Sequence, residues 1–189
     1  MTTTAIHREH AIFRVVLQAV SHPGIGYALP VSCTDSDSQT LLLRMLGCLM
    51  DNEVAFSIIG DDSDSLADAL SFRTGSARVG ISDADFIIAP QGTSDGQLPL
   101  IKRGTLEYPD KGATVVYLID TILDVGGRAL LTGPGVKGTV RPMFIGLADG
   151  ELSGLREVNA EYPLGVDVIL LDAEGRIASI PRSTRIGAH

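Results

Sequence analysis

Three glycines in the second half of the chain have the spacing of a phosphate-binding loop, G-x-G-x-x-G: Gly133, Gly135 and Gly138. In a dinucleotide-binding fold such a motif follows a strand and opens a helix, so that backbone N–H groups face the phosphates. Residues 129–131 predict the strand, but residues 138–140 favour extended chain, and Pro134 has no N–H to offer. The pattern therefore predicts a tight turn between two strands. Lys137, inside the turn, remains a candidate contact for an anion.

Charged residues elsewhere fall where elements are expected to begin or end. Guanidinium groups at such positions suit a carboxylate or phosphate, and structural ion pairs are the alternative. Carboxylates beside Gly or Pro can do acid–base work when paired in a cleft, but they also serve the backbone of loops. His22, just before a proline, packs or caps a helix end or acts in catalysis. The candidates for ligand contact are His22, Arg73, Glu107, Asp110, Lys137, Arg141, Asp167 and Arg182.

The remaining metal-binding and nucleophilic side chains do not form a recognisable set. His7 and His10 have helical i, i+3 spacing that can hold a metal, but no third ligand is near in sequence, and a solvated helix face is expected. Cys33 and Cys48 form no C-x-x-C pair, which gives neither a metal nor a disulfide framework. No nucleophile–base–acid arrangement is evident. We therefore expect no metal site and no cofactor site.

Composition narrows the class of partner. The 189 residues carry a formal net charge of −8, which argues against nucleic acid, because phosphate backbones need a basic face. A small anion held by a few local arginines is still allowed. No apolar run approaches the roughly 18 residues of a membrane span, and the first residues lack the apolar core of a signal peptide. A cytoplasmic protein is expected.

The elements that must position these side chains follow from periodicity. Apolar residues at helical spacing predict helices over residues 6–21, 38–50, 64–73 and from after Pro142 to about 157, with Asp37 or Ser38 as the cap of the second. Alternating or continuous apolar runs predict strands over residues 54–58, 86–89, 113–119, 129–131, 166–171 and 177–180, the last two joined as a hairpin. Residues 181–184 are expected to close the ordered part. The prediction is one α/β domain, residues 1–189, with a mixed sheet flanked by helices.

Several stretches are considered together, in chain order: residues 13–24, 49–54, Thr74-Gly75, 104–110, 133–136, 162–167 and 181–184. Together they resemble the H-subunit family (PhnH) of the bacterial carbon–phosphorus lyase core complex. Each is weak alone, and their order and spacing over nearly the whole chain make the resemblance specific. In it, the glycine stretch is similar to a family turn and not to a dinucleotide loop.

The resemblance implies a subunit of phosphonate catabolism. The family's complex contains companion subunits G, I and J, and its early reaction displaces the adenine of ATP with an alkylphosphonate to give a ribose 1-phosphonate 5-triphosphate. A later S-adenosylmethionine-dependent iron–sulfur subunit breaks the C–P bond. The implied fold is similar to the large domain of PLP-dependent transferases, and isolated H subunits tend to form homodimers.

The cofactor part of the analogy can be tested on the residues. A PLP enzyme needs a Schiff-base lysine, and none of Lys102, Lys111 and Lys137 has a recognisable PLP-lysine setting. Two separated cysteines do not bind an iron–sulfur cluster in the usual way. We therefore favour a non-catalytic assembly subunit. The alternatives are a ligand-handling or catalytic subunit that binds the phosphonate or triphosphate, and an unrelated small α/β enzyme.

Overall fold

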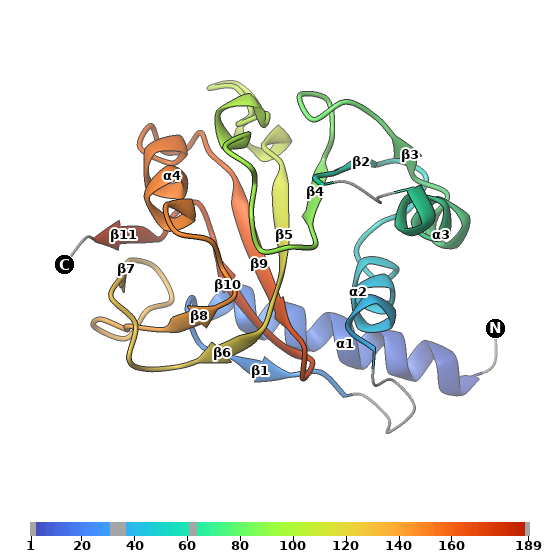
Figure 1. Ribbon diagram of the computed structural model, residues 1–189, viewed down its shortest axis with the longest axis horizontal. Helices are drawn as coiled ribbons and strands as arrows, with labels where there is room; N and C mark the ends of the chain where they lie inside the picture. Colours follow the sequence, from blue (N-terminus) through green and yellow to red (C-terminus); the bar gives the residue numbers. More distant parts are fainter. Residues whose placement is uncertain (1–2, 31–36, 61–63, 188–189) are drawn as a thin grey trace.

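Seven strands form one mixed sheet at the centre of the molecule, in the order β1-β10-β9-β5-β4-β2-β3 (Figure 1). A computed structural model describes residues 3–30, 37–60 and 64–187. The strands β2, β4, β5 and β9 run parallel, β3 is parallel to β2, and β10 and β1 are antiparallel additions at one edge. The strands are β1 Tyr27–Ala28, β2 Ala55–Ile58, β3 Ala77–Arg78, β4 Phe86–Ala89, β5 Thr114–Ile119, β9 Asp167–Asp172 and β10 Arg176–Ile180.

Two short sheets and four helices complete the fold. The pair β6 and β8 and the pair β7 and β11 are each antiparallel, and two single 3-10 turns, η1 and η2, lie between β4 and β5. The bounds are α1 Thr3–Ser21, α2 Ser38–Leu46, α3 Asp64–Thr74, α4 Glu151–Val158, η1 Leu98–Leu100, η2 Pro109–Lys111, β6 Thr121–Leu123, β7 Leu130–Thr132, β8 Met143–Ile145 and β11 Arg185–Gly187.

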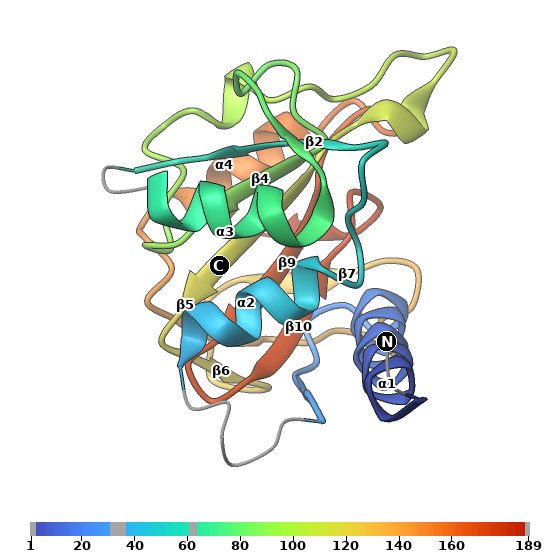
Figure 2. The ribbon, with the colours of Figure 1, turned by 90° about the vertical axis from the view of Figure 1, so that its right-hand side faces the viewer.

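The central sheet separates two apolar cores. Helices α1, α2 and α3 cover one face, and α4 with the β7–β11 sheet covers the other (Figures 1 and 2). Strand β5 serves both cores because alternate side chains of a strand point to opposite faces: Val115 and Tyr117 pack toward α4, and Val116 packs toward the other helices. This explains why the middle strands are continuously apolar. Within the described residues, no helix is both long and apolar enough to cross a membrane.

The expected α/β class with a mixed sheet between helices is confirmed, as are the helices at the N-terminus and near residue 64. The cap of the second helix is Asp37, whose Oδ2 accepts from Thr40 N at 3.1 Å. That helix ends at Leu46, earlier than expected, and Cys48 lies in the turns that follow. Cys33 and residues 61–63 lie outside the described residues.

Two predictions around the C-terminal half are wrong. Residues after Pro142 form strand β8 before the chain reaches α4, because Gly146 adopts a φ of 91° against the backbone of Asp120, a conformation that interrupts a helix. The ordered part also continues beyond Thr184, because β11 pairs with β7. Both strands are only three residues long, which is too short for periodicity to reveal.

Candidate functional site

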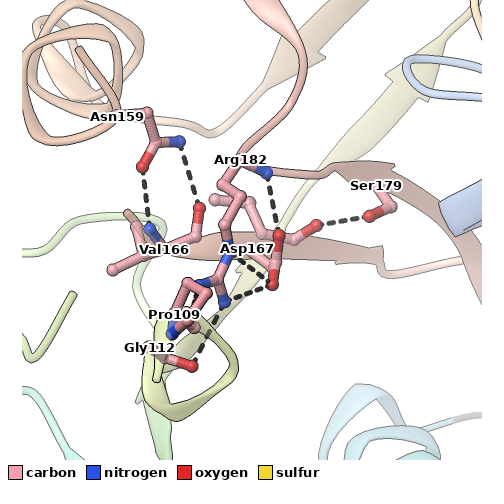
Figure 3. A network of polar contacts seen from close by, with 8 residues as sticks. Pro109, Gly112, Asn159, Val166, Asp167, Ser179 and Arg182 are labelled. Atoms are coloured by element: carbon pink, nitrogen blue, oxygen red, sulfur yellow. Dashed lines mark hydrogen bonds and ion pairs between the residues drawn. The ribbon is translucent and has the colours of Figure 1, made fainter. Parts of the chain in front are cut away.

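The guanidinium of Arg182 ties together three segments that are far apart in the sequence (Figure 3). Its Nε and Nη2 donate to Asp167 Oδ2 at 3.0 and 2.6 Å. Nη1 donates to the carbonyl of Pro109, and Nη2 also donates to the carbonyl of Gly112 at 3.2 Å. The backbone N–H of Arg182 completes the set by donating to Asp167 Oδ1 at 2.8 Å. We call these four residues the Arg182 network.

Local chain geometry places each member of the network. Asp167 opens β9, so its carboxylate lies at the amino-terminal edge of the parallel strands. Pro109 opens the 3-10 turn η2, which aims carbonyl groups back at the arginine. Gly112 lies directly against the backbone of Gly165 and the Arg182 side chain, so a Cβ there would collide with both. A glycine is therefore needed for this close approach.

Asn159 closes the same corner from α4. It ends that helix, and its side-chain Nδ2 donates to Val166 O at 3.0 Å while its Oδ1 accepts from Val166 N at 2.7 Å. Gly165 has a φ of 150° and leaves no space for a side chain beside Asn159. The end of α4 is thus locked to the start of β9 next to the Arg182 network (Figure 3).

Two pockets open on either side of Arg182. The larger, of about 730 Å³, lies between the glycine turn, the end of α4 and β11. The smaller, of about 490 Å³, lies over η2. The larger pocket is lined by Thr132, Gly133, Pro134, Arg156, Asn159, Ala160, Tyr162, Arg182, Ser183, Thr184, Arg185 and Ile186. The smaller is lined by Pro109, Asp110, Tyr162, Pro163, Asp167, Arg182 and Ser183.

The structure brings only some of the sequence candidates together. Asp167 and Arg182 are bonded to each other, and Asp110 shares the smaller pocket with them. Glu107 is exposed on the loop before η2, while Lys137 and Arg141 are exposed and do not line the larger pocket. His22 Nδ1 donates to Gln18 O at 3.0 Å, beside the ring of Tyr27. Arg73 faces Glu9 at 4.0 Å, on the opposite side of the sheet from α4.

The glycine motif is a turn, as the sequence predicts. Gly133, Gly135 and Gly138 have φ values of 126°, 78° and 76°, and after them Val140 pairs back with Leu131 as an antiparallel bridge. No helix begins inside the motif. The part of the turn that touches a pocket is the Gly133-Pro134 step, which forms one wall of the larger one.

A buried acidic network on the α4 side was not anticipated from the sequence. The carboxylate of Glu151 is 6% exposed, and it accepts hydrogen bonds from the Tyr117 hydroxyl at 2.5 Å and from Ser94 N and Oγ at 2.9 Å. Burial first, and the Glu151 carboxylate next, raise the pKa of Tyr117, so its hydroxyl stays a donor. The only sequence signal was a glutamate in the first turn of a helix, which ordinarily indicates an exposed dipole partner.

Lys102, Asp85 and Cys48 carry reactive groups but line neither of the two pockets. Lys102 Nζ is 2.6 Å from Asp85 Oδ1. Burial of Asp85 opposes ionisation, but hydrogen bonds from Lys102 and Ala55 and the nearby positive charges outweigh it and lower the pKa of this carboxyl. Burial, with Glu9, raises the pKa of the Cys48 thiol against the influence of Arg73. Among the described residues, no three metal-ligating side chains lie close enough to hold an ion.

The larger pocket consequently has the chemistry of a binding site more than that of a reaction centre. It offers positive charge and hydroxyl groups. The neighbouring carboxylate of Asp167 forms an ion pair with Arg182. Among its described lining residues there is no histidine, cysteine, lysine or carboxylate to act as a base or nucleophile.

Comparisons with known proteins agree along almost the whole chain. A family model described as bacterial phosphonate metabolism protein (PhnH) matches residues 2–187. A putative C–P lyase subunit protein, HtxG of Stutzerimonas stutzeri, is 31% identical over 185 residues, covering 96% of this chain and 89% of that protein. The alpha-D-ribose 1-methylphosphonate 5-triphosphate synthase subunit PhnH of Rhizobium meliloti (strain 1021) is 26% identical over 188 residues, covering 96% of this chain and 91% of that protein.

Proposed function

Because the chain belongs to the PhnH family of bacterial phosphonate metabolism proteins, we propose that it is a non-catalytic assembly subunit of a carbon–phosphorus lyase core complex. The complex would form ribose 1-phosphonate 5-triphosphate from ATP and an alkylphosphonate. The observation that carries the proposal is the near full-length match to the family, together with two relatives that are themselves named as subunits. Companion subunits of types G, I and J, and a second copy of this chain, are its proposed partners.

The state of the polar side chains supports a non-catalytic role. Arg182 donates to Asp167 and to the carbonyls of Pro109 and Gly112, and Lys102 is paired with Asp85. A catalytic acid or nucleophile needs a free proton or lone pair directed at a substrate. Polar groups that are bonded to one another in this way stabilise the fold and are not available for acid–base or nucleophilic chemistry.

An exposed apolar stripe on α1 supports an interface. Phe13, Leu17 and Val20 are 43%, 49% and 41% exposed, although Ile12 and Val16 on the same helix are buried in the core. Residues at i, i+4 and i+7 share one face of a helix, so the exposed three form a continuous stripe. Apolar surface gathered in this way is typical of a chain that is covered in an assembly.

The fold proposal that accompanies this role is similarity to the large domain of PLP-dependent transferases. Support comes from the parallel strands β2, β4, β5 and β9 with helices on both faces. The three lysines do not favour a retained PLP function: Lys102 is held in an ion pair, and Lys111 and Lys137 are exposed.

Co-purification tests the assembly role. We would tag the chain in its source organism, grow cells on methylphosphonate as sole phosphorus, and identify the companions by mass spectrometry. The expected result is stoichiometric companion subunits with the wild-type chain and their loss with the Phe13→Glu, Leu17→Glu double variant. The matched control is Phe72→Glu, which places the same charge at a side chain that is 94% exposed on α3. Recovery of the chain alone, with no companions in the wild type, would contradict the proposal.

A further inference from the structure

Two arginines of the larger pocket have no acidic partner among the residues that the structure describes. Arg156 lies in the last turn of α4, and Arg185 is the first residue of β11, which packs beside that helix (Figure 1). Both are exposed, and neither forms an ion pair within the described part of the chain. Charged side chains of opposite sign usually approach one another on an acidic protein, and here they do not.

The pocket is positive although the protein is acidic. Of its twelve described lining residues, three are arginines and none is a carboxylate, against a formal charge of −8 for the whole chain. The negative charge of Asp167 neutralises the positive charge of Arg182, whereas no described carboxylate pairs with Arg156 or Arg185. The nearest acidic residues in the chain do not cancel them, since Glu157 does not line the pocket and Glu161 is paired with Arg103 at 3.3 Å.

A buried hydroxyl at the pocket has no hydrogen-bond partner in the described part of the chain. Thr184 lines the pocket and is 5% exposed, and within the described residues its Oγ1 makes no hydrogen bond. Buried polar groups are almost always satisfied, so an orphaned hydroxyl calls for a physical explanation. A bound group that accepts a hydrogen bond supplies one, and an oxyanion beside two arginines is such an acceptor.

The walls fit a small phosphorylated molecule. The volume of about 730 Å³ lies within the range of roughly 300–1,000 Å³ that is common for ligand sites. One wall is the Gly133-Pro134 turn, and Tyr162 and Ile186 add apolar surface. Movement of Arg182 would break its bonds to Asp167, Pro109 and Gly112, so its side chain forms a rigid part of the pocket wall next to the exposed Arg156 and Arg185.

We propose that this pocket binds the phosphate or phosphonate group of a small molecule. The guanidinium forks of Arg156 and Arg185 contact its oxygens, because arginine matches the geometry of such anions with paired N–H donors. The Thr184 hydroxyl, which is covered by protein in the structure, donates a further hydrogen bond once its side chain rotates toward the bound anion. This site goes beyond the assembly role and does not depend on it, since the isolated chain carries every residue involved.

The first experiment is calorimetric titration of the purified chain at low salt with methylphosphonate, inorganic tripolyphosphate and ATP in separate arms. At least one probe should bind saturably with one site per chain, and the arm that binds best separates a phosphonate from a polyphosphate or a nucleotide ligand. Arg156→Gln and Arg185→Gln should each weaken that binding about tenfold or more, the effect of losing a charge-assisted hydrogen bond. No saturable binding at millimolar concentrations of all three probes would overturn the proposal.

The control distinguishes a built site from a diffuse field. Arg141→Gln removes one positive charge from an exposed arginine that does not line the pocket. The affinity of this variant for the anionic probe should stay within about twofold of wild type, because solvent and salt screen a charge that lies outside the pocket. An equal loss with Arg141→Gln would show that anions are attracted only by the general surface, and the site would be rejected.

Thr184 provides the sharpest test of the contact itself. Thr184→Val keeps the shape and removes a hydroxyl that makes no hydrogen bond in the described structure, so the melting temperature without ligand should not fall. Anion affinity should nevertheless fall several-fold, and Thr184→Ser should retain most of it. Wild-type affinity in Thr184→Val would remove the hydroxyl from the site. Because assembly is measured separately by co-purification, failure here and failure of the assembly role are distinguishable.

Discussion

Arg182 and Arg185 are three residues apart in the chain, yet the first is enclosed and the second is open. The Arg182 side chain is 14% exposed and bonds to one carboxylate and two backbone carbonyls. Arg185 is exposed, and no described residue forms an ion pair with it. The two side chains line the same pocket, so one pocket joins an arginine that holds the fold to an arginine that is available.

The difference shows how one residue type serves two purposes. The donors of Arg182 are used by Asp167, Pro109 and Gly112, so any ligand that recruited them would have to break bonds to partly buried acceptors. That penalty is about 1–3 kcal/mol for each group, and more when the group is charged. The Arg185 side chain forms no comparable bonds with the described residues, so it can bind a ligand without breaking any. Recognition of an anion therefore falls to the open arginines, and rigidity falls to the enclosed one.

The largest expected effect comes from removing the enclosed arginine. Arg182→Met keeps much of the apolar stem but removes the side-chain donors to Asp167 Oδ2 and to the carbonyls of Pro109 and Gly112. The free energy of unfolding should fall by about 3 kcal/mol, measured by urea denaturation. Arg185→Met is the matched control and should change it by less than about 0.5 kcal/mol. Equal losses in the two variants would break the comparison.

The second prediction concerns the glycine that lets the corner close. Gly165→Ala introduces a Cβ against Asn159 Oδ1 at a φ of 150°, and should cost about 2–3 kcal/mol of unfolding free energy. Gly138→Ala is the control, because its φ is 76° but the space around it is open. It should cost only about 1 kcal/mol of backbone strain. If both lose the same amount, close packing around the Arg182 network contributes little.

The third prediction asks whether closure itself, and not arginine chemistry, sets the cost. Tyr117→Phe removes the hydroxyl that donates to Glu151 Oε2 in a buried network, without arginine, on the α4 side of the sheet. The loss of unfolding free energy should be about 1–2 kcal/mol, measured by urea denaturation. A loss close to zero would mean that Glu151 is satisfied by Ser94 alone.

The sequence predicted these closed networks only in part. The glycine turn, the individual strands of the central sheet and Asp37 as one of two candidate caps were predictable because each depends on neighbouring residues. The bond between Arg182 and Asp167 joins residues that are fifteen positions apart, and its carbonyl acceptors at Pro109 and Gly112 lie about seventy positions away. Backbone acceptors carry no side-chain signature, so no residue pattern indicates them.

The open arginines were missed for a related reason. Arg156 and Arg185 were not singled out, because an arginine in an amphipathic helix or after a loop is ordinarily a solvated charge. What distinguishes them is the lack of acidic neighbours within a pocket, which depends on the packing of α4 against β11. Arg73 and Arg141 were singled out by their positions at element ends, and neither lines the larger pocket. Only the fold separates these cases.

The fourth prediction uses a pair that is intermediate between enclosed and open. Asp85 and Lys102 are 34% and 26% exposed, and the pKa of Asp85 is lowered in the fold. Folding therefore favours the ionised carboxylate, so this contribution is present at neutral pH and is lost as the pH falls below the ordinary aspartate value of about 3.9 and through the lower folded value. Asp85→Asn should cost less than about 1 kcal/mol at pH 7, because solvent screens the pair.

The measurement is the free energy of unfolding at neutral pH and in acid, below the folded pKa of Asp85. The gap between wild type and Asp85→Asn should close as the pH falls, since the wild-type carboxyl is then neutral too. Asp83→Asn is the control, because Asp83 is exposed and, among the described residues, its carboxylate accepts a hydrogen bond from Ser82 alone. A gap that stays constant with pH would assign the effect of Asp85→Asn to its hydrogen bonds and not to charge.

The smallest effect on stability should come from the open arginine, and it sharpens the comparison most. Arg185→Gln removes a charge that lies near Arg156 without an acidic partner, so the unfolding free energy of the free protein should stay within about 0.5 kcal/mol or rise slightly. An anion that binds only the folded chain adds about 2.7 kcal/mol at one hundred times its Kd. Wild type should therefore gain thermal stability with saturating tripolyphosphate, while Arg185→Gln gains much less at the same concentration. Arg182→Met, compared by the same increment, should begin from a lower melting temperature yet retain part of the gain if its open neighbours still fold into place. An equal rise in melting temperature for wild type and Arg185→Gln would mean that Arg185 contributes neither to anion binding nor to the stability of the fold.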